Sequence, residues 1–153
     1  MSEPHERALV SVRTAVKQGE GTKIFARSLK GSIGKGWSFD VAEPELTGTE
    51  YLLGALAADV IGQFLDLAAR RRIVVDEVEA TAKAELSGTL ALLGVVGAEG
   101  EPHYSSFSLR AWAGSSAPET TLQELWSEAL RRAPLANTLR RAAAFEAVLQ
   151  VQP

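Results

Sequence analysis

The sequence predicts an α+β domain, because strands and helices come in separate runs along the chain. Three segments with strand character precede one long apolar helix, and three more strands, two helices and a last strand follow it. Such segregation is typical of α+β domains and not of parallel α/β sheets. Of the 153 residues, 46% are hydrophobic and 23% are charged, as in an ordinary single domain. We therefore treat residues 1–153 as one domain, with a loose polar tail over residues 1–7.

Alternating apolar residues predict a hairpin and a short third strand at the start of the chain. Residues 8–16 and 22–29 show the alternation of half-buried strands. A third strand is expected over residues 36–41. Three glycines precede or open it, but a strand and not a helix follows them, so they do not form a dinucleotide-binding fingerprint. We expect all three in a turn: Gly31, Gly34 and Gly36.

A capping box marks the start of the long helix. Glu50 follows Thr47 by three positions, so each side chain can accept a hydrogen bond from the other residue's backbone N–H. The helix is expected to end near Arg71. Its most apolar stretch, residues 52–69, contains polar side chains, which indicates a buried helix and not a membrane span. The polar residues at helical spacing form one stripe: Asp59, Gln63, Asp66 and Arg70.

Three strands are expected after this helix. Residues 73–87 alternate between apolar and charged side chains, which predicts one buried and one wet face, as antiparallel sheets allow. Residues 89–96 form an apolar stretch and predict a second strand. Residues 104–112 alternate again.

Two helices and a strand are expected at the end of the chain. A second capping box, from Thr121 to Glu124, predicts a helix over residues 122–132. This helix should end before Pro134, because the residue before a proline disfavours helical backbone. A short helix over residues 135–142 and a strand over residues 145–151 complete the domain.

The composition excludes several kinds of chemistry. The chain has no cysteine, which excludes disulfides, thiolate metal ligands and thiol nucleophiles. Two histidines, His5 and His103, are too few for a usual zinc site, so we expect no metal and no cofactor. A formal net charge of −3 argues against a nucleic-acid partner. The polar start of the chain resembles no signal peptide, and we expect a cytoplasmic protein that does not bind membranes.

Two motifs resemble the OsmC-like family, which includes the organic hydroperoxide resistance proteins. Residues 49–59 are similar to the opening of the family's central helix, where Glu-Leu-Leu and small residues lead to a cysteine. Residues 133–139, Ala-Pro-Leu-Ala-Asn-Thr-Leu, are similar to the family's Cys-Pro-x-x-Asn-Thr-Leu, and residues 72–79 resemble the strand between them. The resemblance implies an intertwined homodimer, with antiparallel sheets around long buried central helices. It also implies sites at the subunit interface and a role in stress response.

The family's peroxidase chemistry uses two cysteines, and their positions here are Asp59 and Ala133. A carboxylate and a methyl group cannot pass through the sulfenic acid and disulfide cycle, so the chain is not expected to be a cysteine-based peroxidase. The family's helper glutamate lies ten residues before the first cysteine, where this chain has Thr49. Glu50 is therefore expected to cap the helix. Arg27 is the candidate for the family's helper arginine.

Three interpretations of Asp59 remain open. It can face water or pair with Arg27 or with an arginine of the other subunit. It can form the floor of an interfacial pocket for a cationic or hydroxyl-bearing ligand, with Gln63, Arg27, Thr49 and Glu50 as further ligand-binding candidates. It can also act as the general base of a hydrolytic enzyme, if burial raises its pKa. We expect a structural or small-ligand-binding homodimer, with the hydrolytic enzyme as the alternative.

Overall fold

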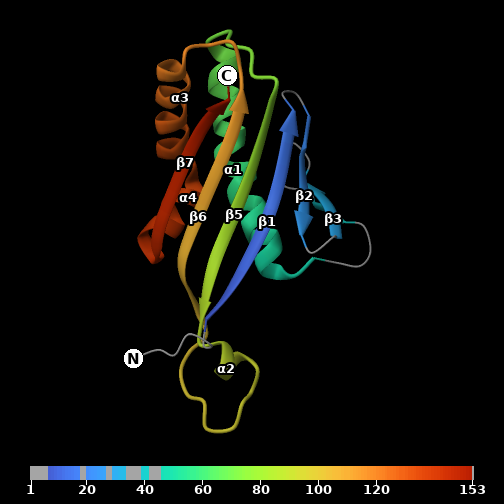
Figure 1. The fold of residues 1–153 in the computed structure, drawn as a ribbon, viewed down its shortest axis with the longest axis vertical. Coiled ribbons are helices and arrows are strands. Elements are labelled where there is room, and N and C mark those ends of the chain that lie inside the picture. Colours follow the sequence, from blue (N-terminus) through green and yellow to red (C-terminus); the bar gives the residue numbers. More distant parts are fainter. Residues whose placement is uncertain (1–6, 18–19, 27–28, 34–38, 42–45, 153) are drawn as a thin grey trace.

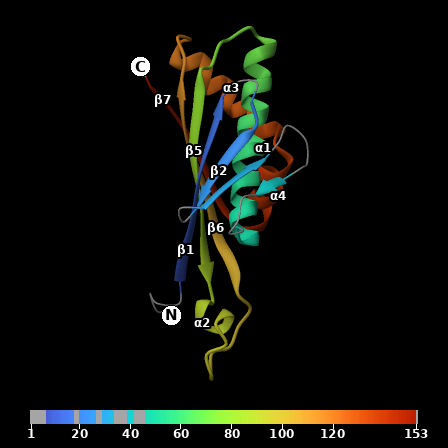
Figure 2. The same cartoon turned by 90° about the vertical axis from the view of Figure 1, so that its right-hand side faces the viewer.

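The structure is a computed structural model that describes residues 7–17, 20–26, 29–33, 39–41 and 46–152. One seven-stranded sheet forms a single layer, and three of the four helices cover one of its faces (Figures 1 and 2). The strands are β1 (Arg7–Lys17), β2 (Thr22–Ala26), β3 (Leu29–Ile33), β4 (Phe39–Val41), β5 (Glu77–Ser87), β6 (His103–Gly114) and β7 (Ala144–Gln152). The helices are α1 (Gly48–Arg70), α2 (Thr89–Leu92), α3 (Glu119–Arg132) and α4 (Pro134–Ala142).

The sheet has the strand order β4-β3-β2-β1-β5-β6-β7. All neighbours pair antiparallel except β6 and β7, which are parallel. Along β5 every second side chain is buried against the helices, and the intervening ones face away from them. The predictions of an α+β fold and of a sheet with one wet face are therefore confirmed. The buried side chains of β5 are Val78, Ala80, Ala82, Ala84 and Leu86.

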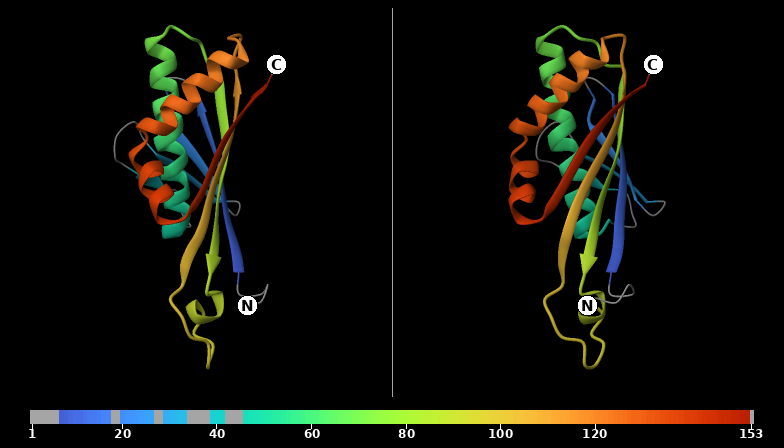
Figure 3. Two further views of the ribbon diagram at one scale, coloured as in Figure 1. Left: turned by 90° about the vertical axis from the view of Figure 1, so that its left-hand side faces the viewer. Right: turned by 60° about the vertical axis from the view of Figure 1, so that its left-hand side comes forward.

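Helix α1 begins and ends where the sequence predicts. The Thr47 hydroxyl accepts a hydrogen bond from the Glu50 N–H at 3.3 Å, and a Glu50 carboxylate oxygen accepts one from the Thr47 N–H at 2.9 Å. Among the described helices, α1 alone is long and apolar enough to cross a membrane, but 56% of its most apolar window is buried within the fold. Helix α1 packs against β1 and β5 on this face, and α3 and α4 lie beside it and against β7 (Figure 3). It is therefore the central core helix of this chain.

The first strands differ from the prediction in their boundaries. The predicted strand over residues 22–29 is divided, because β2 ends at Ala26 and β3 begins at Leu29, its direct antiparallel partner. The apolar pattern that predicts one strand here does not show that two strands pair with each other. Gly31 lies inside β3 opposite Ile24, and its assignment to a turn is wrong. Gly34, Gly36 and residues 1–6 of the expected tail lie outside the described residues, and Arg7 already belongs to β1.

Strand β5 begins at Glu77, four residues later than predicted. The preceding segment ends helix α1 instead of pairing in the sheet. Arg72 has a positive φ of 57°, and the Ile73 N–H donates to the Ala68 carbonyl oxygen at 2.8 Å. The apolar residues 73–75 therefore make the connection from helix to sheet.

The predicted apolar strand over residues 89–96 is wrong. These residues form the one-turn helix α2 and turns, at the tip of the hairpin that joins β5 to β6. Pairing between β5 and β6 reaches Ser87 and His103, so the segment between them projects beyond the sheet and has no strand to pair with (Figure 1). Its large apolar side chains are exposed, Val96 by 99% and Leu93 by 71%. We call these side chains the apolar tip: Leu92, Leu93, Val95 and Val96.

The second predicted capping box is also wrong. Helix α3 begins at Glu119 after Pro118, with no side chain capping it, so Thr121 and Glu124 lie inside the helix. Proline already has the backbone φ that a helix start requires. The helix therefore begins directly after Pro118 and not after Thr121. The end of α3 at Arg132 is as predicted, and α4 and β7 begin one residue earlier than predicted.

Candidate functional site

Asp59 and Ala133 belong to elements that meet in the structure. Asp59 lies in the middle of α1, and Ala133 is the fully buried residue that precedes α4. The Asp59 Oδ2 atom accepts hydrogen bonds from the backbone N–H groups of Leu135, at 2.9 Å, and Ala136, at 3.3 Å. Asp59 therefore holds the start of α4 against α1.

These hydrogen bonds satisfy the free N–H groups at the start of α4. The first N–H groups of a helix have no partner inside it and are usually capped by the side chain just before the helix. Here that residue is Ala133, which has no acceptor side chain, and Pro134 has no N–H. The Asn137 N–H bonds the Ala133 carbonyl oxygen at 3.0 Å. Asp59 thus supplies, from another helix, the capping group that Ala133 lacks.

This role of Asp59 is not one of the interpretations that the sequence raises. Sequence rules for capping look within three or four residues of a helix start, whereas Asp59 and Leu135 are 76 residues apart. The available signal is the pair Ala133-Pro134, which opens a helix without any capping side chain. The free N–H groups at such a helix start need a hydrogen-bond acceptor from elsewhere in the fold.

Burial sets the electrostatics of Asp59. The carboxyl group is partly buried, and this burial raises its pKa above the ordinary value of 3.8. The hydrogen bonds from Ala136 and Leu135 lower the pKa but do not cancel the effect of burial. Within the described part of the chain, Asp59 forms no ion pair with an arginine or a lysine. Arg27, its predicted partner, lies outside that part.

The other candidate residues do not gather around Asp59. Thr49 and Glu50 lie at the start of α1, about 15 Å from Asp59 at 1.5 Å per residue. The Thr49 hydroxyl forms a short hydrogen bond with the Tyr104 hydroxyl of β6, and Glu50 is buried in the capping box, as predicted. Gln63 is partly buried one turn after Asp59. Among the candidate residues that the structure describes, only Gln63 is therefore near enough to share a site with Asp59 within one chain.

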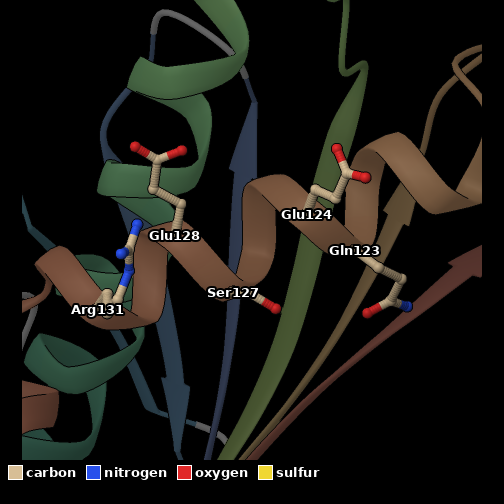
Figure 4. A pocket seen from close by; sticks show the side chains of 5 residues that line it. All are labelled: Gln123, Glu124, Ser127, Glu128 and Arg131. Carbon is tan, nitrogen blue, oxygen red and sulfur yellow. The ribbon is translucent and has the colours of Figure 1, made fainter.

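Two surface hollows are lined by residues of α3, and Asp59 lines neither of them. The first has a volume of about 420 Å³ and is lined by Gln123, Glu124, Ser127, Glu128 and Arg131 (Figure 4). The second has a volume of about 310 Å³ and lies where α3, α4 and β7 meet. The described residues contain no group of three His, Asp or Glu side chains that could hold a metal ion. The clearest chemical feature at the predicted site is thus the capping carboxylate.

Comparisons with known proteins identify the fold and the family. A sequence model described as OsmC-like protein matches residues 42–148. No curated protein matches the sequence. Solved structures do match: an OsmC-like protein from Mycoplasma pneumoniae is 15% identical, with a TM-score of 0.60 and coverage of 92% of this chain and 96% of that one.

Two further structures carry a more specific description. An OsmC-like hydroperoxide resistance protein from Jannaschia sp. CCS1 is 13% identical, with a TM-score of 0.64 and coverage of 88% of this chain and 87% of that one. The organic hydroperoxide resistance protein OhrB of Bacillus subtilis is 17% identical, with a TM-score of 0.53 and coverage of 92% and 97%. The match of the family model and the shared α+β fold agree with the two sequence motifs. The chain belongs to the OsmC-like protein family.

Proposed function

We propose that this chain is an OsmC-like protein without thiol peroxidase activity, in which the positions of the two family cysteines now stabilise the fold. The observation that carries the proposal is the pair of hydrogen bonds from Leu135 and Ala136 to Asp59, next to Ala133. A peroxidase of this family needs a thiolate that is oxidised and a second thiol that resolves it. The chain has no cysteine, and the carboxylate that replaces the first one is occupied in capping α4.

The alternative is a hydrolytic enzyme that uses Asp59 as a general base. One observation favours it: in the described part of the chain Asp59 Oδ1 accepts no hydrogen bond, and burial raises the pKa of the carboxyl group. A general base also needs a substrate within hydrogen-bond reach. The hollows described above are not lined by Asp59, so the structural role is the better supported one.

The test is a peroxidase assay with the purified protein, cumene hydroperoxide and a dithiol reductant. We expect no consumption of hydroperoxide above the rate without protein, because no residue can carry the sulfur chemistry. A family member with both cysteines, assayed in parallel, shows that the conditions support turnover. Dithiol-dependent turnover by this chain would overturn the proposal. Ester hydrolysis that disappears in Asp59→Asn would instead support the alternative.

We further propose that two copies of this chain form a cytoplasmic homodimer, with the apolar tip in the interface. Four large apolar side chains exposed together on a projecting segment are unusual for a monomer and indicate a contact surface. The apolar tip extends beyond the sheet (Figure 1), where it can reach a second chain. Asp59 and Gln63 are the proposed small-molecule site of this dimer, at a position on α1 that is separate from the apolar tip.

The dimer is tested by sedimentation of a variant that carries both Leu93→Asp and Val96→Asp. We expect the wild-type protein to sediment as a dimer and the variant to shift toward the monomer, since burying two new carboxylates in an apolar contact is costly. The control is Val74→Asp, because Val74 is also exposed, by 64%, but lies before the start of β5, at the opposite end of that strand from the apolar tip. A monomeric wild-type protein, or a variant that remains dimeric, would refute the proposed interface.

A further inference from the structure

The hollow where α3, α4 and β7 meet contains two arginines and no acidic side chain. It is lined by Ser127, Leu130, Arg131, Arg140, Phe145 and Ala147, and its volume is about 310 Å³. We call it the basic hollow. The basic hollow and Asp59 lie at opposite ends of helix α4. Asp59 accepts hydrogen bonds from the first turn of α4, whereas Arg140 lies near the last residue of that helix.

The two arginines of the basic hollow carry charges that the described part of the chain does not neutralise. Arg71 and Arg132 both pair with Glu128, at 2.6 Å and 2.9 Å. Glu128 lies one turn before Arg131 on α3, so these two ion pairs occupy the acidic group that Arg131 could otherwise use. Neither Arg131 nor Arg140 forms an ion pair with a described residue. The hollow is therefore locally positive in a chain whose formal net charge is −3.

The basic hollow also has an apolar wall that orients one of the guanidinium groups. The Arg140 guanidinium carbon lies 5.7 Å from the centroid of the Phe145 ring, within the range of a cation–π contact. Leu130 and Ala147 extend the apolar surface, and Ser127 adds one hydroxyl. A guanidinium group binds carboxylates through parallel N–H groups. Cationic and apolar surfaces thus lie side by side in one small space.

We propose that the basic hollow binds a small organic anion with a carboxylate head and a short apolar chain. The carboxylate would bind between Arg131 and Arg140, while the chain would lie against Phe145 and Leu130. The hollow has a volume of about 310 Å³ and is open to solvent, so a ligand with a short chain is sufficient to cover its apolar wall. This site does not depend on the role of Asp59 or on the absence of peroxidase activity.

Octanoate is the probe that tests the proposal, followed by backbone amide shifts in two-dimensional NMR. We expect saturable shifts at residues of the basic hollow, with a Kd of about 1 mM for a ligand of this size. Octylamine, which has the same chain and the opposite charge, should produce no saturable shifts there. Octylamine binding as tight as that of octanoate would show that the apolar wall alone is recognised, and would overturn the proposal.

Matched variants distinguish binding in the basic hollow from nonspecific attraction to positive charge elsewhere on the surface. Arg131→Gln and Arg140→Gln should each weaken octanoate binding about three- to tenfold, as expected for the loss of one charged hydrogen-bond donor at a partly exposed site. Arg140→Lys should retain more affinity than Arg140→Gln. Arg141→Gln, an exposed change on the same helix outside the hollow, should leave the affinity unchanged.

Thermal melts of each variant establish that the fold is intact before its affinity is compared. Equal weakening by Arg141→Gln would refute a defined site, as would the absence of saturable octanoate shifts in the wild-type protein. The remaining possibility is that an acidic side chain of a second copy occupies the hollow. In that case Arg131→Gln would shift the protein toward the monomer in sedimentation, and this result would also contradict the proposal.

Discussion

Replacing Phe64 with alanine is expected to lower the free energy of unfolding by about 3–5 kcal/mol. Phe64 is fully buried on α1 and meets the Trp126 ring of α3 edge to face, with centroids 5.8 Å apart and planes at 74°. The substitution removes the buried apolar surface, leaves a cavity and breaks an aromatic pair that contributes on its own. A loss of this size is a large part of the total stability of an ordinary domain.

Chemical denaturation followed by tryptophan fluorescence and circular dichroism measures this loss. The control is Leu93→Ala, which also removes a large apolar side chain but from a position that is 71% exposed in the apolar tip. In the monomer this change should alter the free energy of unfolding by no more than about 0.5 kcal/mol. Because Leu93 lies in the proposed dimer interface, both variants are compared at a concentration where the chain is monomeric. A loss below about 1 kcal/mol for Phe64→Ala would contradict the central packing of α1 against α3.

Local patterns predicted the elements that depend on local interactions. The capping box of Thr47 and Glu50 and the alternation along β5 involve neighbours within a few residues, and both are confirmed. The prediction for residues 89–96 failed because hydrophobicity does not show whether a partner strand exists. Those residues stay exposed since β5 pairs directly with β6.

The candidate site was predicted in part, for a similar reason. The family resemblance singled out residues 59 and 133, and the structure places Asp59 against the start of α4, next to Ala133. What Asp59 does there depends on which backbone N–H groups α4 leaves free, and that follows from tertiary packing. Side-chain identity at residue 59 alone is equally consistent with an ion pair, a ligand site or a cap.

Replacing Asp59 with alanine is expected to lower the free energy of unfolding by about 1–2 kcal/mol, the usual cost of losing a helix cap. The N–H groups of Leu135 and Ala136 would lose their acceptor, and the buried position of Ala136 limits access of water to them. Asp66→Ala is the control, because Asp66 is exposed on the same helix. Hydrogen exchange at Leu135 and Ala136 should accelerate in Asp59→Ala and remain unchanged in Asp66→Ala.

Asp59→Asn separates the hydrogen-bond acceptor from the negative charge. The asparagine carbonyl oxygen can accept from the same two N–H groups, and a neutral group avoids the cost of burying a carboxylate. We therefore expect the free energy of unfolding of Asp59→Asn at pH 7 to be within about 0.5 kcal/mol of the wild-type value. It should be clearly higher than that of Asp59→Ala. If the two variants were equally destabilised, the charge and not the acceptor would be the stabilising feature.

The pH dependence of the same variants tests the sign of the pKa shift. Burial raises the folded-state pKa of Asp59 above its ordinary value of 3.8, so the folded protein holds this proton more tightly than the unfolded chain. The stability that Asp59 contributes through this linkage is fully present below the unfolded pKa and is lost as the pH rises through the folded pKa. The wild-type protein should thus gain stability relative to Asp59→Asn on acidification through this window. Denaturation of both proteins between neutral pH and pH 3 measures the difference, in which titrations common to both proteins cancel. A relative loss on acidification would show that the hydrogen bonds from Leu135 and Ala136 outweigh burial, and that the charged cap is the stabilising form.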